Sequence, residues 1–348
     1  MICAHDFKFE RLTPAEIDFE ALDQFEDRLF SQRKCWLDVL TSFVWGEPIV
    51  AALMRGPETV GYFTGMLFRR AGVKILASPF RGWTTPYMGF NLQPDIGRST
   101  ALAALERFAF RDLGCLHLEV ADRYLELEEG SGYGFSQRIV HGYLSDLAQD
   151  DEALLKGMSS ACRRAIRKSA KEGVTIVAGE PDGFAEQLHE HLGFVFAKQG
   201  LKQSYGPDRV QRLIDASYPS GNLLLLRAFE PGGKCIATGV YPGFRSYSFF
   251  WGNGSHPDFL TLRPNEALHW NAMRYWRDQG VLHHDWGGSG AYKAKYGGTP
   301  FTTLAVWKSR YKAIRFARDM AEKLYYLPRN LMRDRYDARV KAHRGELG

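Results

Sequence analysis

The feature that most constrains the fold of this chain is the order of its predicted elements, which is similar in the two halves. Each half begins with strands, because runs of β-branched and aromatic residues are separated there by Gly and Pro turns. A helix follows in each half, at 100–113 and at 264–279, where apolar side chains recur at helical spacing. A further strand is expected after each helix, at 117–120 and at 281–286. This order predicts an α/β fold with mixed sheets in two domains, although no repeat is visible residue by residue.

Length and charge suggest the domain limits. The 348 residues are too many for one ordinary core and suit two domains of roughly 150 residues each. We expect a first domain over 1–149, a second domain over 150–310 that carries the transfer chemistry, and a basic helical tail over 311–348. Residues 301–348 hold 12 Lys and Arg and 5 Asp and Glu, a net charge of +7, whereas the whole chain has only +5. A local basic segment favours a phosphate-bearing partner or an anionic surface.

Composition favours a soluble cytosolic protein. Hydrophobic residues make up 45% and charged residues 24% of the chain, which is typical of globular domains. No apolar run approaches the ~20 residues that span a bilayer, and the first ten residues lack the apolar centre of a signal peptide. The five cysteines are far apart and have no metal-binding spacing. We therefore expect reduced thiols, no metal site and a cytoplasmic location.

A basic helix is predicted just after the domain boundary. Arg163, Arg167 and Lys171 recur every four residues and share one face, with Arg164 and Lys168 beside them. Like charges at this spacing repel each other unless an anion lies against them. We therefore expect phosphate to bind there, as a diphosphate, a CoA arm or the backbone of tRNA. The alternative is a solvated surface helix, which is the usual role of a charge run.

Two segments carry a resemblance to a known family: Cys162–Val174 (CRRAIRKSAKEGV) and Leu262–Gly298 (LRPNEALHWNAMRYWRDQGVLHHDWGGSGAYKAKYGG). The second has a helix that opens near Asn265-Glu266, a strand that ends in Asp-Trp-Gly-Gly, and an aromatic-Lys pair before an aromatic-Gly-Gly. It resembles the closing pattern of the FemAB family, which adds amino acids to peptidoglycan precursors, and of its broader acetyltransferase-like (GNAT-like) relatives. The resemblance implies two tandem GNAT-like domains and transfer of an acyl or aminoacyl group to an amine.

The resemblance also implies a catalytic role for Lys293, which matches the lysine of the aromatic-Lys pair. An amine that attacks an ester or thioester creates an oxyanion, and a positioned cation stabilises it. Without the resemblance, Lys293 would be interpreted as a solvated lysine near a hairpin turn. Asp285 ends the preceding strand and either takes the proton of the attacking ammonium or caps the following loop. Adjacent His283 and His284 point to opposite faces of that strand, so no zinc site is expected.

Arg263 and Asn265 open the helix before this strand, where free N–H groups favour anions. Among the relatives that this segment resembles, an ordinary GNAT domain has the pattern Arg/Gln-x-x-Gly-x-Gly/Ala at the start of the corresponding helix. The glycines of that pattern let the backbone cradle the pyrophosphate of CoA. The pattern is missing from both halves of this sequence. We expect no permanently bound cofactor, and a donor that is either aminoacyl-tRNA or acyl-CoA.

The acceptor site is predicted from aromatic residues in loops. Arg81, Trp83 and Tyr87 lie in a glycine-bearing loop, whereas Trp251 and Tyr292 follow strands of the second half. Aromatic side chains with one Arg suit a nucleotide or a sugar. The alternative for each residue is packing onto the core. The expected acceptor is an amine-bearing sugar, peptide or lipid-linked precursor of the cell envelope or of a polysaccharide.

The helical tail has two interpretations. A basic amphipathic helix lies on an anionic membrane, which would bring the protein to the inner face of the membrane. The alternative is a helix that packs back on the first domain with its arginines in solvent. The residues concerned are Arg315, Arg318, Arg329, Arg333, Arg335 and Arg339, with Tyr325, Tyr326, Leu327, Leu331 and Met332.

The expected function is therefore N-acyl or aminoacyl transfer that forms an amide bond. Two alternatives stay open at this point. One is a CoA-dependent N-acetyltransferase with an atypical cradle for its donor. The other is a non-catalytic module of the same fold that binds RNA or membrane through its basic surfaces.

Overall fold

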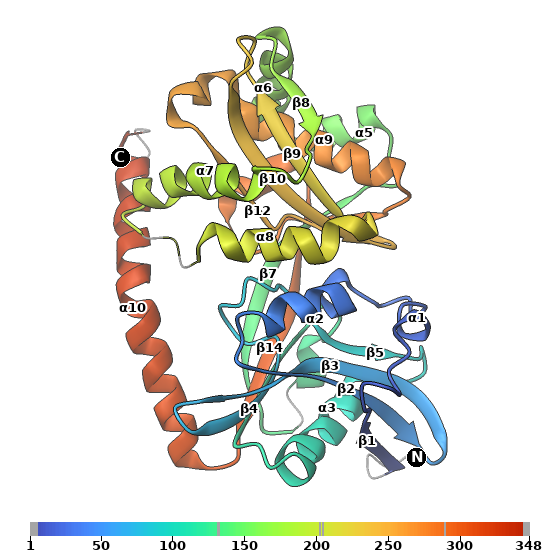
Figure 1. Cartoon of the computed structure of the whole chain (residues 1–348). Coiled ribbons are helices and arrows are strands. Elements are labelled where there is room, and N and C mark those ends of the chain that lie inside the picture. The colour runs from blue at the N-terminus through green and yellow to red at the C-terminus, as the bar shows by residue number, and fades with distance from the viewer. Residues whose placement is uncertain (1–5, 131–132, 202, 204, 289, 344–348) are drawn as a thin grey trace.

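The computed structural model describes residues 6–130, 133–201, 203, 205–288 and 290–343, without the side chains of residue 291 and of residues 328–343. Two lobes lie one above the other in Figure 1, and one long helix runs beside both of them. The lower lobe is built mainly from the first half of the chain and the upper lobe from the second half. The mixed α/β class predicted from the sequence is confirmed.

The lower lobe is a twisted sheet with helices on its faces. Its strands are β1 (Phe7–Arg11), β2 (Gly46–Arg55), β3 (Glu58–Arg70), β4 (Val73–Ser78), β5 (Gly89–Leu92) and β6 (His117–Asp122). Its helices are α1 (Phe19–Leu22), η2 (Phe30–Gln32), α2 (Lys34–Thr41), α3 (Arg98–Arg107), the π-helical η3 (Phe108–Asp112) and α4 (Leu127–Gly130). The central residues of β2 and β3 are buried in nearly unbroken runs, because both faces of the sheet are covered there.

The upper lobe has the same kind of layers. Its strands are β8 (Thr175–Ala178), β9 (Leu223–Phe229), β10 (Cys235–Phe244), β11 (Tyr247–Phe249), β12 (Gly252–Ser255) and β13 (His283–Asp285). Its helices are α5 (Asp151–Gly157), α6 (Ser160–Lys171), α7 (Phe184–Lys198), α8 (Pro207–Ser217), η4 (Tyr218–Ser220), η5 (Pro257–Leu262), α9 (Pro264–Asp278) and η6 (Ala291–Tyr296). Proline stands in the first turn of α8 and α9, where its missing N–H leaves no helical hydrogen bond unmade.

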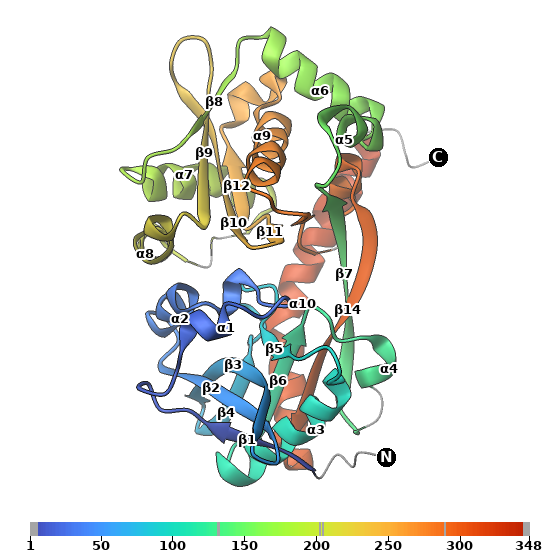
Figure 2. The same cartoon turned by 90° about the vertical axis from the view of Figure 1, so that its right-hand side faces the viewer.

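Two long antiparallel strands, β7 (Ser136–Asp146) and β14 (Thr299–Ser309), connect the lobes (Figure 2). β14 comes late in the chain, yet residues 304–309 pair with β6 of the lower lobe. The upper end of β7 pairs with β13. The sheet is therefore continuous through both lobes, in the order β1-β2-β3-β4-β6-β14-β7-β13-β11-β10-β9-β8, with β5 on β3 and β12 on β10.

One arrangement occurs once in each lobe. β4 and β6 pair in parallel and are connected through α3, and β11 and β13 pair in parallel and are connected through α9. In each case the first strand of the pair is broken, and its continuation (β5 or β12) pairs with the strand before it. Each second strand ends in an aspartate, Asp122 or Asp285. The duplication inferred from the order of elements is confirmed by this topology.

The cores of the two lobes are joined. One apolar cluster fills the lower lobe and includes Leu304 and Val306 of β14. A further cluster lies between the lobes and contains Trp36 of α2 and Phe249 of β11, whose ring centroids are 6.2 Å apart. Helices α2 and α8 meet in this cluster. Because separating the lobes would expose these buried rings, the apolar contact holds the lobes together.

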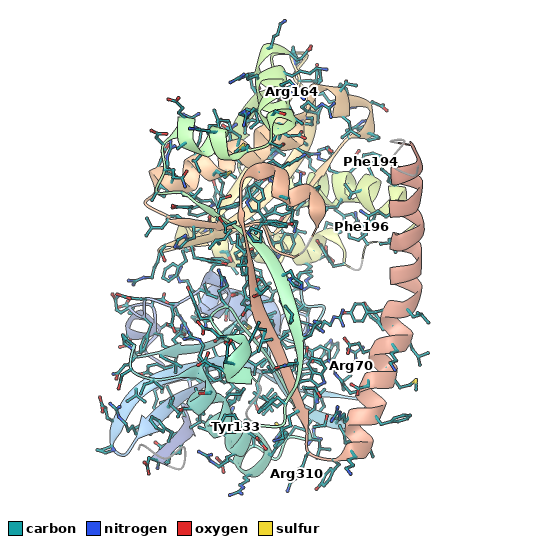
Figure 3. The ribbon with its side chains drawn as sticks, turned by 180° about the vertical axis from the view of Figure 1, so that it is seen from behind. Arg70, Tyr133, Arg164, Phe194, Phe196 and Arg310 are labelled. Carbon is teal, nitrogen blue, oxygen red and sulfur yellow. The ribbon has the colours of Figure 1, made fainter. Side chains whose placement is uncertain are left out.

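The helix α10 (Lys312–His343) begins directly after β14, at the foot of the molecule where Figure 3 labels Arg310. Its first turns pack on the lower lobe, because the Arg318 guanidinium lies 4.2 Å from the centroid of the Trp307 ring. Glu322 forms ion pairs with Arg81 and Arg138 of the lower lobe. The tail therefore contacts the first lobe, as one of the two interpretations expected. The predicted tail residues after Leu327 lie outside the described side chains.

Three further findings concern the described residues alone. No helix among them is both long and apolar enough to cross a bilayer. They contain no group of three or more His, Cys, Asp and Glu side chains that could hold a metal ion. Four described cysteines carry free thiols, and Cys3 lies outside the described residues.

Candidate active site

Asp285, a predicted catalytic residue, lies at the end of β13 and is completely buried. Its Oδ1 atom accepts a hydrogen bond of 2.6 Å from the Gly287 N–H, and its Oδ2 atom accepts one from the Tyr247 hydroxyl. Burial raises the pKa of Asp285 above its usual range, and these two donors, with the charges of Arg123 and Lys293, oppose the rise. The carboxylate is therefore more basic than an exposed aspartate, which suits a proton acceptor.

Lys293, the second predicted catalytic residue, lies in η6 after a glycine loop. Gly287 and Gly288 have φ near +56° and +57°, a backbone conformation that residues with a Cβ rarely adopt. This turn brings the Lys293 ammonium to the Gly287 carbonyl and to 5.5 Å from the centroid of the Phe250 ring. Burial lowers the pKa of Lys293 to about 8, and the charge of Asp285 opposes the fall. The structure thus brings Asp285 and Lys293 to the same glycine turn.

A residue of the lower lobe completes this site. Arg123, directly after β6, donates a hydrogen bond of 2.8 Å from its Nε atom to the Tyr247 hydroxyl, which in turn donates to Asp285. The Arg123 guanidinium also lies 3.9 Å from the centroid of the Phe301 ring. Tyr87, predicted to bind substrate, packs against Tyr247 in a small apolar cluster between the lobes. The charge and orientation of Asp285 thus depend on a chain of contacts from the other lobe.

An aromatic cage surrounds a buried histidine beside Lys293. The Nδ1 atom of His269, in the middle of α9, is 3.0 Å from the Tyr241 hydroxyl oxygen. The rings of Phe250, Trp286 and Tyr296 have centroids 4.9, 5.2 and 4.8 Å from that of His269. Burial lowers the pKa of His269 well below its usual value, and nearby His and Lys side chains lower it further. His269 is therefore a neutral imidazole, and its cage holds the glycine turn and η6 against α9.

His283 and His284, which precede Asp285, are not arranged as ligands of one metal ion. The His284 Nδ1 atom is 2.9 Å from the Ser248 Oγ atom, and burial lowers the pKa of His284 to about 3. The Nδ1 atom of His283 and the Nε2 atom of His284 are buried without hydrogen-bond partners. Because the two side chains point to opposite faces of β13, they cannot ligate one ion.

The start of α9, predicted to hold the donor, is occupied by the protein's own side chains. Asn265 donates to the Ser255 Oγ atom at 3.1 Å and accepts from the Asn253 amide at 2.8 Å. Glu266 forms an ion pair of 2.7 Å with Lys295. Arg263 is exposed, with φ +61°, and points its charge to solvent at the helix start. Among the described residues, this end of α9 therefore offers one exposed cation, Arg263, beside a carboxylate that Lys295 neutralises.

The basic helix predicted over 152–172 is two helices, and this divides its cations. Asp150 caps α5 and Ser159 caps α6, with Met158 extended between them. The Arg163 guanidinium donates to the Lys156 carbonyl at 3.2 Å and to the Met158 carbonyl, so it closes the end of α5.

The remaining cations of α6 form an exposed surface, which we call the α6 basic face: Arg164, Arg167, Lys168 and Lys171. In the described part of the chain none of them has an ion pair with a carboxylate. Figure 3 labels Arg164 at the tip of the upper lobe. α6 nevertheless starts close to the catalytic candidates, because the Ser159 N–H donates to the Lys295 carbonyl at 2.9 Å.

The other predicted substrate residues lie in three different places. Arg81 pairs with Glu322 and lies 3.8 Å from the centroid of the Tyr326 ring, so it anchors α10. Trp83 is buried in the core with Phe68 and Phe80.

Trp251 is half-buried at the break between β11 and β12, and its ring contacts that of Tyr205. Its indole N–H is buried without a hydrogen-bond partner. Tyr292 is half-exposed beside Lys293. Of the predicted substrate residues, Tyr87 and Tyr292 are thus the ones that lie beside the Asp285–Lys293 pair.

Sequence reasoning missed Arg123, Tyr247 and His269. A signal for Arg123 was present, since Asp122-Arg123 ends a strand in the first half as Asp285-Trp286 does in the second. No local pattern indicates Tyr247, because its role depends on the contact between β11 and β13. His269 stands in an apolar helix face and has no motif of its own.

Comparison with known proteins identifies the fold around this site. Residues 157–299 match the family model described as an acetyltransferase (GNAT) domain. No curated protein sequence is significantly similar to this chain.

Among solved structures, FemX superposes with a TM-score of 0.69 at 13% identity, over 85% of this chain and 96% of FemX. L-PGS from Bacillus licheniformis gives 0.53 at 13% identity over 87% and 94% of the two chains. A tandem GNAT protein from the clavulanic acid biosynthesis pathway gives 0.51 at 14% identity over 86% and 97%. The predicted fold class of two tandem GNAT-like domains with a helical tail is confirmed, as is the resemblance to FemAB-like and GNAT-type proteins.

Proposed function

Because residues 157–299 match the model of an acetyltransferase (GNAT) domain, we propose that the protein is an N-acyltransferase or aminoacyltransferase. It forms an amide bond on an amino group of a cell-envelope or polysaccharide precursor, in the cytoplasm. The observation that carries the proposal is the position of Asp285 and Lys293 at one glycine turn, between two parallel strands that diverge. The acceptor is a sugar, a peptide or a lipid-linked compound that carries an amine.

The reacting groups are placed, in this proposal, where the two strands diverge. The Phe250 N–H still donates to the Asp285 carbonyl at 2.8 Å, whereas the next N–H, that of Trp251, donates to Val240 of β10 at 3.1 Å. The segment that follows β11 thus changes its hydrogen-bond partner from β13 to β10 within one residue. Asp285 and the turn that carries Lys293 lie beside this point. A carbonyl group that enters between the strands would meet a proton acceptor and a cation together.

The proposed reaction begins with loss of a proton from the acceptor ammonium to the Asp285 carboxylate. The free amine attacks the carbonyl carbon of the donor ester or thioester and forms a C–N bond. The Lys293 ammonium stabilises the oxyanion of the tetrahedral intermediate. The C–O or C–S bond to the carrier then breaks, and the carrier leaves with the electron pair and takes up the proton that Asp285 holds. The nitrogen of the new amide loses its remaining extra proton to the Asp285 carboxylate, which releases it to solvent. Tyr292, which is half-exposed beside Lys293, lines the path of the acceptor, whereas Tyr87 is buried against Tyr247 and supports the site from within.

The α6 basic face supports a donor on a phosphate-rich carrier. Arg167, Lys171 and their neighbours are exposed, carry no carboxylate partners among the described residues, and continue from the helix end nearest Lys293. Arg side chains suit bidentate contacts with phosphate. Arg163 contributes by fixing the junction of α5 and α6 beside η6.

The start of α9 favours aminoacyl-tRNA over acyl-CoA as the donor. Pro264 has no N–H to offer, the Asn265 side chain is already bonded, and Glu266 places a carboxylate in the first turn. A pyrophosphate at a helix start needs free N–H groups and no nearby anion. The match to a GNAT acetyltransferase domain keeps acyl-CoA as the alternative donor.

A titration calorimetry experiment separates the donors. The folded protein is titrated with acetyl-CoA, with a non-hydrolysable long-chain CoA analogue, and with tRNA. Micromolar binding of a CoA compound that is lost in Arg263→Ala identifies a CoA-dependent enzyme with an atypical cradle. Binding of tRNA alone, lost in Arg167→Ala and Lys171→Ala, supports the aminoacyl donor.

Turnover tests the chemistry itself. We expect Lys293→Met to lower the rate of amide formation by about 10²–10³, because one oxyanion donor is removed. The circular dichroism spectrum should be unchanged. Wild-type turnover in this variant would remove Lys293 from the mechanism. If no amine is acylated by the wild-type protein, and tRNA binding falls steeply with salt, a non-catalytic RNA-binding module takes the place of the enzyme.

A further inference from the structure

The amphipathic pattern of α10 is inverted in its described part. Ile314, Arg318, Glu322 and Tyr326 follow one another at intervals of four residues and are the less exposed positions. Three of these four side chains are polar, and they make the contacts with Trp307, Arg81 and Arg138. A helix that only packs on a domain turns its apolar face inward. Here the inward face is the polar one.

The apolar face of α10 is directed away from the lobes. Its side chains are Phe316, Met320, Leu324 and Leu327, with exposed fractions of 68%, 42%, 68% and 58%. They follow at intervals of four, four and three residues, so they form one stripe along the helix. In Figures 1 and 2 α10 runs along the outside of both lobes, and this stripe faces solvent. A contiguous exposed apolar stripe indicates a binding surface.

Cations border one side of the stripe. Lys312, Arg315 and Lys323 are exposed on the described part of α10. Asp319 lies in the same row as these cations and forms ion pairs with Arg318 at 3.2 Å and with Arg315 at 3.9 Å, whereas Glu322 pairs with Arg138 of the lower lobe at 3.4 Å. Lys312 and Lys323 have no carboxylate partner among the described residues. The outward side of residues 312–327 is therefore apolar along its centre and positive along one edge.

We propose that α10 lies on an anionic lipid bilayer, with the stripe of Phe316, Met320, Leu324 and Leu327 in the interface and Lys312 and Lys323 on the headgroups. An apolar stripe bordered by cations is the combination that binds helices to anionic bilayers. A second copy of this chain fits less well, because two α10 helices would place their positive edges against each other. The ion pairs of Arg318 and Glu322 hold the helix so that the stripe stays outward.

The proposal adds a location to the proposed acyl transfer and does not depend on it. A helix that lies on the membrane would hold both lobes at the surface where lipid-linked acceptors are found. Binding to vesicles is measured without substrate, so a failure of this proposal leaves the enzymatic proposal untouched, and the reverse also holds.

The test is sedimentation of the full-length protein with vesicles. We expect binding to vesicles of phosphatidylcholine mixed with phosphatidylglycerol, little binding to phosphatidylcholine alone, and a decrease as salt is added. Phe316→Asp with Leu324→Asp should weaken binding by at least about tenfold, because each inserted side chain contributes about a tenfold to hundredfold factor. Lys312→Gln with Lys323→Gln should remove the preference for phosphatidylglycerol.

A matched control uses apolar residues that are exposed elsewhere. Leu127→Asp on α4 and Val177→Asp on β8 change side chains that are 42% and 48% exposed, and they should leave vesicle binding unchanged. Equal loss in these controls would overturn the proposal, as would the absence of wild-type binding to anionic vesicles. Sedimentation velocity decides the rival occupant: a dimer that Phe316→Asp dissociates, together with unchanged vesicle binding in that variant, would assign the stripe to a second copy.

Discussion

At the residue scale, two groups with opposite pKa shifts meet at one turn. Asp285 is held above the usual range of an aspartate and Lys293 below that of a lysine, in both cases because burial disfavours the charged form. The two charges also stabilise each other, so each opposes the shift of its partner. Compared with exposed side chains, the carboxylate of this pair accepts a proton more readily and the ammonium releases one more readily.

The pair predicts a bell-shaped pH dependence of kcat/KM. The rate should rise with pH as Asp285 loses its proton, at a pKa above the ordinary 3.8, and fall as Lys293 loses its proton near pH 8. Lys293→Arg should have a lower maximum but no alkaline fall, since a guanidinium keeps its proton throughout this range. The wild-type protein and Lys293→Arg are compared on the same acceptor, so the ionisation of the acceptor amine affects both rates equally. It therefore cancels in the ratio of their kcat/KM values. An alkaline fall that persists in Lys293→Arg would exclude Lys293 as its source.

The contact from Arg123 through Tyr247 to Asp285 makes a second prediction. Tyr247→Phe removes the hydroxyl that donates to the carboxylate, which should raise the pKa of Asp285 further. The acid limb of the pH profile should then move to higher pH, and kcat should fall by about ten- to hundredfold, as expected for a charge-assisted hydrogen bond of about 1.5–3 kcal/mol. Tyr218→Phe, a half-exposed tyrosine of η4, is the control. A purely structural role for Tyr247 would lower stability and leave the acid limb in place.

The sequence located these two catalytic candidates but not their partners. Asp285 and Lys293 are close in sequence, and the family pattern covers both. Tyr247 and Arg123 come from other elements, and Arg123 comes from the other lobe. Their contacts depend on how β13 pairs with β7 and β11, which no local pattern encodes. Contacts between distant elements also explain why the predicted substrate-binding roles of Arg81 and Trp83 do not fit the structure. Their loop has the composition of a binding loop, but Arg81 pairs with Glu322 of α10 and Trp83 packs in the core against Phe68.

At the scale of elements, the long periodic segments were predictable and the interruptions were not. The predicted helices over 100–113 and 264–279 and the predicted strands over 117–120 and 281–286 are present in the structure, as α3 with η3, α9, β6 and β13. The single helix predicted over 152–172 is two helices in the structure, because the Ser159 side chain caps the second one. The break was not predictable, because the charged residues that follow Ser159 also suit one continuous helix. The glycine-bearing loop predicted around Arg81, Trp83 and Tyr87 leads into β5, whose residues pair with β3 through contacts distant in sequence.

Element packing predicts the effect of one glycine in β12. A Cβ atom at Gly254 would lie 2.4 Å from the His191 carbonyl carbon and 2.5 Å from the Leu192 nitrogen of α7, both backbone atoms. Gly254→Ala should therefore lower the free energy of unfolding by about 1–3 kcal/mol, since the helix has to move away from the strand. Gly252→Ala in the same strand meets no atom within 4 Å and is the control. Equal urea midpoints for the two variants would contradict this close approach.

At the scale of the whole molecule, the two lobes share a sheet and a core. β14 supplies Leu304 and Val306 to the lower core although it follows the upper lobe in sequence. The limits of the two domains at residue 149 and residue 310 stay a prediction, since β7 and β14 belong to both lobes. Sequence order could indicate two similar units, but it could not indicate that strands of one run into the other.

This shared construction predicts one cooperative unfolding transition. Scanning calorimetry should give a single peak with a calorimetric enthalpy close to the van't Hoff enthalpy. Leu304→Ala should lower the stability of the whole molecule by about 2–5 kcal/mol and keep the transition single. Thr302→Ala, at an exposed position of the same strand, should have little effect. Two resolved peaks, with only one of them moved by Leu304→Ala, would show that the lobes unfold separately.

The late position of β14 has a consequence for biosynthesis. A nascent chain exposes the facing edges of β6 and β7 as soon as they leave the ribosome, and the strand that belongs between them follows only after roughly 150 further residues. At about 5–20 residues per second, the gap in the lower sheet persists for about 8–30 s. Unpaired strand edges are the surfaces on which incomplete chains aggregate. The newborn lower lobe is thus a natural client for a chaperone until the last strand arrives.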